Sequence, residues 1–399
     1  MDPMSTSHNQ ELPAFSKIVF SLPSGFMVSG VTTWSVEMTR HINLVDQMAI
    51  LIRHTPYPGY PEVFYSDRQT LNVLECPGAT PYSIARENIL PQYRAIYEHL
   101  APATFVPNWA PAIYSVCAAL AQEDPDRLRV IGYAHSDEPY YYETLQYFEP
   151  IIHKFIAVSQ DVGDCLGKFI PSRKKDILIL PYPVRAQKVL TRNYTMSPDR
   201  PLKIVYAGRL QSRQKRIYDL VSLVKKLIAQ GVNFHLFICG NGPEEQDLRN
   251  EMQSISYTQN EYVTFVGTVS PDNMPRVWTN ADICILVSDF EGTSITMLEA
   301  MASGSVPIVT NTSGTQKFIK SQDNGFVVEI GDIEGIAKVV KMLDSNRSFL
   351  AKMGRQAHKT LQEHYSYDNY VSWFLRLSKE IWQQPSRSWP ADRSIYFSV

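Results

Sequence analysis

Residues 282–309 read DICILVSDFEGTSITMLEAMASGSVPIV. A short apolar run typical of a buried strand leads into a Glu-Gly loop, a helix, a Gly turn and a second apolar strand. Parallel strands that alternate with helices form a doubly wound sheet, and ligands bind beyond the carboxyl ends of such strands. This stretch therefore predicts an α/β fold and indicates which loop belongs to the functional site.

Two carboxylates stand eight positions apart in this stretch, Glu291 in the loop and Glu299 about two turns into the helix. At that spacing both can line one cleft at different depths. The free backbone amides of Gly292, Thr293 and Ser294 at the helix start can hydrogen-bond hydroxyl groups or an anion in the same cleft. Acidic residues also favour the first turns of helices, so two solvated glutamates are the alternative.

The same alternation extends along the chain in two cycles. In the first, strands are expected at 17–22, 48–52, 130–134 and 155–158, with a glycine-bearing loop and a helix from 33 to about 42 after the first strand. In the second, strands are expected at 203–207, 234–239, 263–266, 283–287 and 306–309. Residues 181–201 hold four prolines and no sustained periodicity, which is typical of a linker. We therefore divide the chain into an N-terminal Rossmann-like domain (1–183), a linker (184–201), a C-terminal Rossmann-like domain (202–365) and a helix with a tail (366–399).

Composition excludes several classes of protein. The 399 residues carry 38 Lys and Arg against 40 Asp and Glu, a net charge of −2, which argues against a basic nucleic-acid-binding protein. The five cysteines are scattered, which predicts reduced thiols and no metal site. No apolar run reaches the roughly 18 residues of a membrane-spanning helix, and the N-terminal residues lack an apolar signal core. These features favour a cytoplasmic location.

Several further motifs occur in the second cycle. They are the strand-Gly-Arg-Leu segment VYAGRL (205–210), the turn ICGNGPE (238–244) and the strand VTFVGTV (263–269). Together with the Glu-x7-Glu pair, in this order and spacing, they resemble the retaining glycosyltransferases of family 4. The resemblance covers most of residues 200–330 and implies the GT-B architecture, in which two Rossmann-like domains face each other across a cleft. It also implies an acceptor-side N-terminal domain, a donor-binding C-terminal domain and a C-terminal crossing helix that returns to the N-terminal domain.

The resemblance implies roles for individual residues of the C-terminal domain. Arg209 and Lys215 would stabilise the charge that grows on the diphosphate as it leaves, because fixed cations suit that task. Glu291 would hold hydroxyl groups of the donor sugar, and Glu299 the ribose diol, since ionised carboxylates accept two hydroxyl donors well. Gly267 would lie beside the base. The spacing leaves open whether Lys215 or its neighbour Arg216 contacts the phosphates.

The N-terminal domain resembles the family less closely. Gly30 matches the first glycine loop, where backbone amides approach the donor phosphates and a side chain would block them. His135, at the end of the strand 130–134, matches a histidine that contacts the donor sugar near its anomeric carbon. An ordinary strand-to-helix turn and an ordinary core histidine are the alternatives for these two residues. Residues 56–110 match nothing in the family, and acceptor recognition is one use for them.

The function implied is retaining transfer of a sugar from a UDP- or GDP-type nucleotide sugar, with UDP favoured, to an acceptor hydroxyl. The acceptor could be a saccharide, a lipid or a small molecule. No cofactor and no metal are expected, because cations and helix amides already supply positive charge to the diphosphate. Membrane contact is possible but not favoured, since residues 1–183 carry 13 Lys and Arg against 19 Asp and Glu. The alternatives are a nucleotide-sugar epimerase, a sugar phosphorylase or a non-catalytic nucleotide-sugar-binding subunit.

Overall fold

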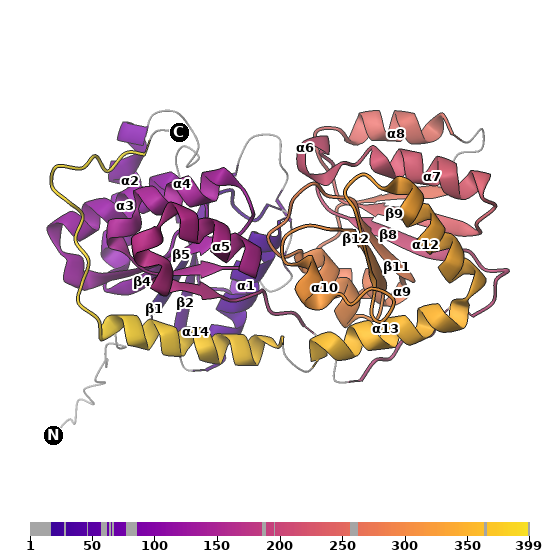
Figure 1. Ribbon diagram of the computed structural model, residues 1–399. Coiled ribbons are helices and arrows are strands. Elements are labelled where there is room, and N and C mark those ends of the chain that lie inside the picture. Colours follow the sequence, from indigo (N-terminus) through magenta and orange to yellow (C-terminus); the bar gives the residue numbers. More distant parts are fainter. Residues whose placement is uncertain are drawn as a thin grey trace, which may run out of the picture.

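The computed structural model describes residues 17–27, 29–45, 47–56, 62–63, 65, 68–76, 86–185, 189–194, 196–255, 262–362 and 365–397. Within them the chain forms two α/β units that lie side by side, the first in purple and the second in pink to orange (Figure 1). Each unit is built on one parallel sheet, and the predicted α/β fold is confirmed.

The first sheet has seven strands in the order β3-β2-β1-β4-β5-β6-β7, all parallel. Its strands are β1 (Lys17–Leu22), β2 (Met48–His54), β3 (Val73–Cys76), β4 (Ala103–Val106), β5 (Leu128–Ala134), β6 (Ile152–Ala157) and β7 (Ile177–Ile179). Its helices are α1 (Gly30–Asn43), α2 (Arg86–Leu100), α3 (Pro111–Glu123), α4 (Pro139–Tyr147) and α5 (Gln160–Phe169). Alternate residues of β1 enter two different hydrophobic clusters, because helices cover both faces of the sheet.

The second sheet has six parallel strands in the order β10-β9-β8-β11-β12-β13. Its strands are β8 (Leu202–Ala207), β9 (Phe234–Cys239), β10 (Val263–Gly267), β11 (Ile283–Leu286), β12 (Val306–Thr310) and β13 (Phe326–Val328). Its helices are α6 (Ser212–Lys215), α7 (Asp219–Ala229), α8 (Glu245–Gln253), α9 (Met274–Asn280), α10 (Ile295–Ala302), α11 (Thr315–Phe318), α12 (Ile333–Ser345) and α13 (Arg347–Gln362). In both sheets the strand order reverses direction, next to β1 in the first and next to β8 in the second, and such switch points open a crevice for ligands.

Local signals explain most element boundaries, and the structure corrects some of them. The first helix begins at Gly30 and not at residue 33, because Ser29 caps it by accepting a hydrogen bond from the Thr32 amide. Strand β4 was not expected, since it lies inside the segment 56–110, which the sequence analysis left unplaced. All four are buried, because β4 lies between β1 and β5 in the sheet.

The last long helix, α14 (Tyr367–Trp382), belongs to the first unit in space although it follows the second in sequence. It runs beneath the first sheet, in yellow, after the chain leaves α13 (Figure 1). The Trp382 indole N–H donates to the Thr104 hydroxyl at 2.9 Å, and Arg129 donates to the carbonyl of Ile381 at 3.0 Å. The expected crossing helix is confirmed.

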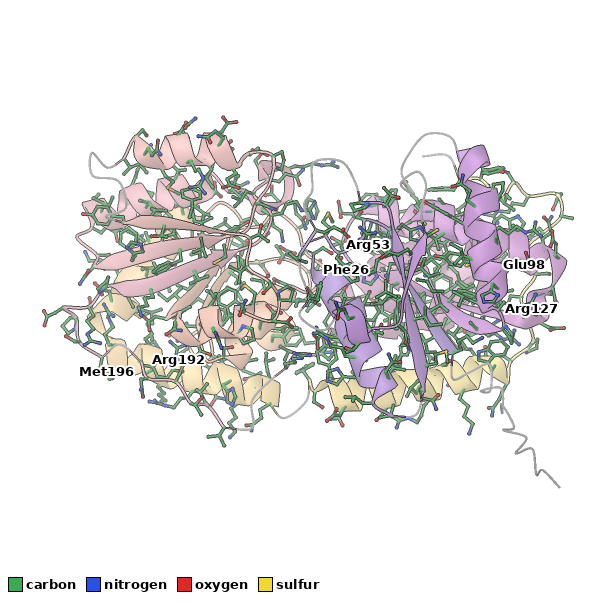
Figure 2. The ribbon with its side chains drawn as sticks, turned by 180° about the vertical axis from the view of Figure 1, so that it is seen from behind. Phe26, Arg53, Glu98, Arg127, Arg192 and Met196 are labelled. Carbon is green, nitrogen blue, oxygen red and sulfur yellow. The ribbon has the colours of Figure 1, made fainter. Side chains whose placement is uncertain are left out.

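The segment expected as a linker packs closely where the structure describes it. The Val184 amide donates to the carbonyl of Tyr365 at 2.8 Å, so the two connections between the units lie side by side. Arg192 is buried beside the second sheet, where it pairs with Asp282 at 3.3 Å. Figure 2 shows Arg192 near the yellow helix α13. Tyr194 also contacts this helix, because the Arg355 guanidinium lies over the Tyr194 ring, 5.5 Å from the ring centroid.

Candidate active site

A pocket of about 410 Å³ lies between the two units, at the carboxyl ends of their strands. The residues after β1, β4 and β5 form one side, and those after β8, β9 and β11 form the other. Most residues singled out from the sequence line it, namely Gly30, His135, Arg209, Lys215, Glu291, Gly292, Thr293, Ser294 and Glu299. The structure therefore brings together residues from both halves of the chain in one crevice.

Gly267 is not among the residues that line this pocket. It ends β10 with φ of +77°, a conformation that favours glycine, and its carbonyl accepts a hydrogen bond from the Gly240 amide at 2.8 Å. Gly240 does line the pocket. Gly267 therefore supports the pocket wall from behind.

Lys215 and Glu291 form an ion pair inside the pocket. The Lys215 ammonium lies 2.5 Å from Oε1 of Glu291, and the Ser288 hydroxyl donates to the same oxygen at 2.7 Å. Arg216, by contrast, has φ of +46° at the end of α6, and this left-handed turn directs its guanidinium to Asp289 at 3.0 Å. The geometry thus places Lys215, and not Arg216, in the pocket.

Arg209 follows β8 and supplies the second cation of the pocket. The Tyr206 hydroxyl donates to the Arg209 carbonyl at 3.0 Å and fixes the backbone there. Within the described part of the chain, no carboxylate forms an ion pair with its guanidinium. This charge is therefore available to an anionic ligand.

Glu299 also lines the pocket, on the helix α10 that follows the loop. Loss of solvation raises the pKa of Glu299 from an ordinary 4.5 to about 7; the Glu37 carboxylate contributes to the rise, while Trp278 and Arg185 oppose it. Glu37 and Arg185 themselves pair at 2.5 Å. The two pocket glutamates thus differ in their surroundings, because Glu291 pairs with Lys215 whereas Glu299 has a raised pKa.

The loop between Glu291 and the start of α10 packs against the opposite unit. Ser294 caps α10 by accepting from the Met297 amide at 3.3 Å. The Thr293 hydroxyl donates to the carbonyl of Val158, 135 residues away in sequence, at 2.6 Å. A Cβ on Gly292 would lie only 2.3 Å from the His135 carbonyl oxygen, so the close approach requires glycine. This loop closes the bottom of the crevice.

His135 is buried and both of its ring nitrogens are engaged. Nδ1 lies 2.6 Å from the Tyr182 hydroxyl, and Nε2 lies 3.0 Å from Oδ1 of Asn108. The Asn108 amide group donates to the Ser21 carbonyl, so its Oδ1 accepts from Nε2–H, and Nδ1 accepts from Tyr182. Burial lowers the pKa of His135 to about 3, which keeps the ring neutral at physiological pH.

Sequence reasoning missed several residues on the N-terminal side of the pocket. They are Trp109, Glu138, Tyr140, Tyr141 and Tyr182. A signal for Trp109 existed, because the run Ala103–Val106 followed by a proline has the form of a strand and its carboxyl-terminal loop. The described residues contain no group of three or more His, Cys, Asp or Glu side chains suited to a metal ion. An Asp-x-Asp tripeptide, a pattern that can hold a metal ion beside a diphosphate, occurs at 124–126, but it precedes β5 and lies outside the residues that line the pocket.

Residues 190–360 match the model of the family described as glycosyl transferases group 1. The match covers less than half of the chain. The resemblance to family 4 glycosyltransferases that the motifs indicated is confirmed. None of the helices in the described ranges is both long and apolar enough to cross a membrane.

Curated relatives match over part of their length. The chain is 31% identical over 168 residues to an uncharacterised glycosyltransferase of Methanocaldococcus jannaschii, and the match covers 42% of each chain. It is 28% identical over 158 residues to the N-acetyl-alpha-D-glucosaminyl L-malate synthase of Bacillus anthracis, which covers 40% of each chain. The matched stretch thus spans less than half the length of these two relatives.

Solved structures resemble nearly the whole chain. S. aureus TarM in complex with fondaparinux, alpha-GlcNAc-glycerol and UDP has a TM-score of 0.74 at 12% identity, covering 92% of this chain and 100% of that one. Sucrose-phosphate synthase of Thermosynechococcus elongatus has a TM-score of 0.74 at 16% identity, with coverage of 92% and 99%. The pneumococcal O-GlcNAc transferase GtfA in complex with UDP and GlcNAc has a TM-score of 0.70 at 12% identity, again with 92% and 99% coverage. At these identities the likeness shows the fold, and the GT-B arrangement is confirmed.

Proposed function

We propose that this protein is a retaining glycosyltransferase that moves a sugar from a UDP-sugar to an acceptor hydroxyl. The observation that carries the proposal is the convergence of two cations, Arg209 and Lys215, and two carboxylates, Glu291 and Glu299, in one crevice between two Rossmann-like domains. The match of residues 190–360 to the group 1 family model supports it. The UDP present in the complexes of TarM and GtfA favours uridine over other bases.

The cations are suited to the departing diphosphate. Negative charge grows on the phosphate oxygens as the anomeric bond breaks, and preorganised positive groups in a sheltered site stabilise that charge strongly. Arg209 would supply a planar fork for two oxygens, and Lys215 a point charge. A diphosphate would compete with Glu291 for the Lys215 ammonium and release that carboxylate toward the sugar hydroxyls. The amino-terminal end of α1 at Gly30 adds backbone amides on the opposite side.

His135 is poorly suited to act as a base or nucleophile. Its Nδ1 accepts from Tyr182, its Nε2–H donates to Asn108, and burial holds its pKa at about 3. A ring fixed in this way positions the pocket wall and leaves proton removal to another group. This supports a front-face reaction, in which an oxygen of the departing diphosphate accepts the proton of the acceptor hydroxyl.

Thermal shift against UDP-, GDP-, ADP- and dTDP-sugars tests the donor assignment. A ligand that binds only the folded state raises the melting temperature according to its concentration relative to its dissociation constant. We expect the largest shift with UDP-sugars. If no nucleotide sugar in the panel shifts the melting temperature, the donor-site assignment is wrong.

Two rival activities share the fold and are separated by product analysis. A nucleotide-sugar epimerase accumulates the epimer without an acceptor, and a phosphorylase requires inorganic phosphate. We expect neither product when the protein is incubated with its UDP-sugar, with or without phosphate. A non-catalytic subunit would bind the nucleotide and release no UDP under any condition.

The unpaired cysteines, four of them buried, support the cytoplasm as the location.

The raised pKa of Glu299 predicts a pH dependence of donor binding. An ionised carboxylate accepts hydrogen bonds from both ribose hydroxyls, while a protonated one loses acceptor capacity. Because the pKa of Glu299 lies at about 7, donor affinity should rise as the pH increases from about 6 to about 8 and then level off. Below the pKa the loss approaches about tenfold per pH unit. Calorimetric titration with a UDP-sugar across this range measures it.

Glu299→Gln should flatten this pH profile, whereas Glu251→Gln, an exposed position on α8, should preserve it. The raised pKa of Glu299 also makes the stability of the folded protein depend on pH, because the folded state favours the protonated carboxyl group. The stabilising contribution of Glu299 is full below a pH of about 4.5 and is lost as the pH rises through about 7. A pH-independent donor affinity in the unmodified protein would contradict the assignment of Glu299 to the ribose.

Gly292→Ala should weaken donor binding by preventing close contact between the two units. The added methyl would lie 2.3 Å from the His135 carbonyl oxygen and 2.7 Å from Cγ2 of Val158. Overpacking of this kind costs about 1–3 kcal/mol, which corresponds to roughly 5- to 150-fold in affinity. Gly167→Ala on α5 is the matched control, since its nearest neighbour would be at an ordinary 3.6 Å. Equal affinities of both variants for a UDP-sugar would show that the contact is dispensable.

A further inference from the structure

We propose that the acceptor of this enzyme is a neutral saccharide that stacks on an aromatic wall formed by Trp109, Tyr140 and Tyr141 and is hydrogen-bonded by Glu138. This inference rests on the proposed glycosyltransferase function and names the class of its second substrate. All four residues line the pocket between the two units and come from the N-terminal one. They face the side where Arg209, Lys215 and Glu291 stand.

The fold places these four residues together although they come from two loops. Trp109 follows β4, and Glu138 to Tyr141 follow β5. The two strands are parallel neighbours, so their carboxyl ends open at the same edge of the sheet. The aromatic wall is therefore anchored on rigid strands next to the point where the strand order reverses.

A proline sets the direction of the tyrosines. Pro139 occupies the first position of α4, which fixes the helix start immediately after Glu138. Successive helical residues point about 100° apart, so three adjacent tyrosines cannot share one face. Tyr142 points into the core and donates to Asp137 at 2.6 Å, whereas Tyr140 and Tyr141 line the pocket.

Tyr141 lies between the acidic and the basic side of the pocket. Its ring is edge-on to His135, with centroids 6.0 Å apart, and edge-on to Tyr140 at 6.2 Å. Burial raises the pKa of Tyr141 above its ordinary value, Glu138 raises it further and Arg209 lowers it. The phenol thus stays protonated, and it lies close enough to Glu138 and Arg209 for both charges to act on its pKa. An acceptor held against this ring is next to the diphosphate cations.

The chemistry of the wall fits a sugar ring. A pyranose has apolar C–H faces and a polar rim, so a large flat aromatic surface binds the face while polar groups bind the rim. Trp109, Tyr140 and Tyr141 are only half-buried, which leaves ring surface for a ligand. The Glu138 carboxylate accepts hydrogen bonds from hydroxyl groups, and charged acceptors make stronger bonds than neutral ones.

The charge distribution selects against anionic acceptors. Among the described residues of the N-terminal unit that line the pocket, Glu138 carries the only full charge at neutral pH, and none is a lysine or arginine. A phosphate group brought to this side would lie near a carboxylate without a side-chain cation from the same unit. Phospholipids and sugar phosphates are therefore disfavoured on this side relative to neutral saccharides.

Saturation-transfer NMR on the 399-residue chain tests the inference with defined probes. The probes are neutral mono- and disaccharides, namely glucose, galactose, mannose, maltose, cellobiose and sucrose, with glucose 6-phosphate and phosphatidylglycerol vesicles as anionic probes, each with and without UDP. We expect transfer to at least one neutral sugar and stronger transfer to it than to glucose 6-phosphate or the vesicles. Trp109→Ala should abolish the transfer, Trp109→Phe should restore part of it, and Glu138→Gln should weaken it severalfold. Glu143→Gln, an exposed position on the same helix, should leave it unchanged.

The outcomes separate the two proposals. UDP binding is followed independently by thermal shift, so a protein that binds UDP while no neutral saccharide shows transfer refutes the acceptor assignment alone. Preferential transfer to glucose 6-phosphate or to the vesicles also refutes it, as does saccharide binding that Trp109→Ala does not change. A protein without any UDP response fails the proposed function, whatever the saccharides do.

Discussion

Arg209→Ala should lower the turnover of the UDP-sugar by about 100- to 1,000-fold, because removing one preorganised group that stabilises transition-state charge has an effect of that size. Arg209 follows β8 at the switch point of the second sheet and lines the pocket without a carboxylate partner in the described residues. Its charge is needed most when the diphosphate departs. The rate of UDP release in the presence of acceptor measures the effect.

The affinity for the donor should change less than the turnover, since the interaction strengthens as charge develops. Arg213→Ala is the matched control, because Arg213 is exposed on α6 only four positions away and does not line the pocket. Its turnover should equal that of the unmodified protein. Should Arg209→Ala retain its rate, the diphosphate must bind elsewhere and the proposed mechanism fails.

Arg192→Ala should destabilise the protein by about 3–5 kcal/mol, because it leaves the buried Asp282 carboxylate without its cation. The side chains of Arg192 and Asp282 are 1% and 2% exposed and lie 3.3 Å apart. The other Asp282 oxygen accepts from the Lys203 amide at 3.0 Å, which ties the pair to the first strand of the second sheet. Chemical denaturation of the full chain measures the loss as a lower midpoint.

Two further variants separate the loss of the pair from the loss of a long side chain. Arg200→Ala, at an exposed position of the same connecting segment, should leave the midpoint almost unchanged. Combining Arg192→Met with Asp282→Asn removes both charges and should recover part of the lost stability, since a neutral amide is less costly to bury than an unpaired carboxylate. A midpoint for Arg192→Ala equal to that of Arg200→Ala would show that the pair contributes no stability.

The connection between the units was expected to be a simple linker, and this explains why the Arg192 pair could not be predicted. The four prolines of residues 181–201 correctly indicate a break in secondary structure. The prolines do not indicate against which surface of the protein the segment packs. Arg192 reaches an aspartate 90 positions away, and only the folded second unit brings the two together.

The sequence alone determined the elements that depend on short-range pattern. Apolar runs and glycine turns predicted the strands that later form β1, β5, β8, β9 and β12 within a few residues. The Glu-x7-Glu stretch placed one carboxylate in a loop and one on a helix, as the structure has them. These features follow from local sterics and periodicity, which neighbouring residues specify by themselves.

Only the tertiary structure decided which groups meet and in what state. It directed Lys215 inward and Arg216 outward, placed Glu299 near the Glu37 carboxylate, and brought Trp109 into the same pocket as the tyrosines that follow β5. Charge state depends on burial and on charges close in space, and the crevice joins residues more than 100 positions apart, as the Thr293 bond to Val158 illustrates. Burial and proximity of that kind arise when whole sheets and helices pack, so no local pattern in the chain encodes them.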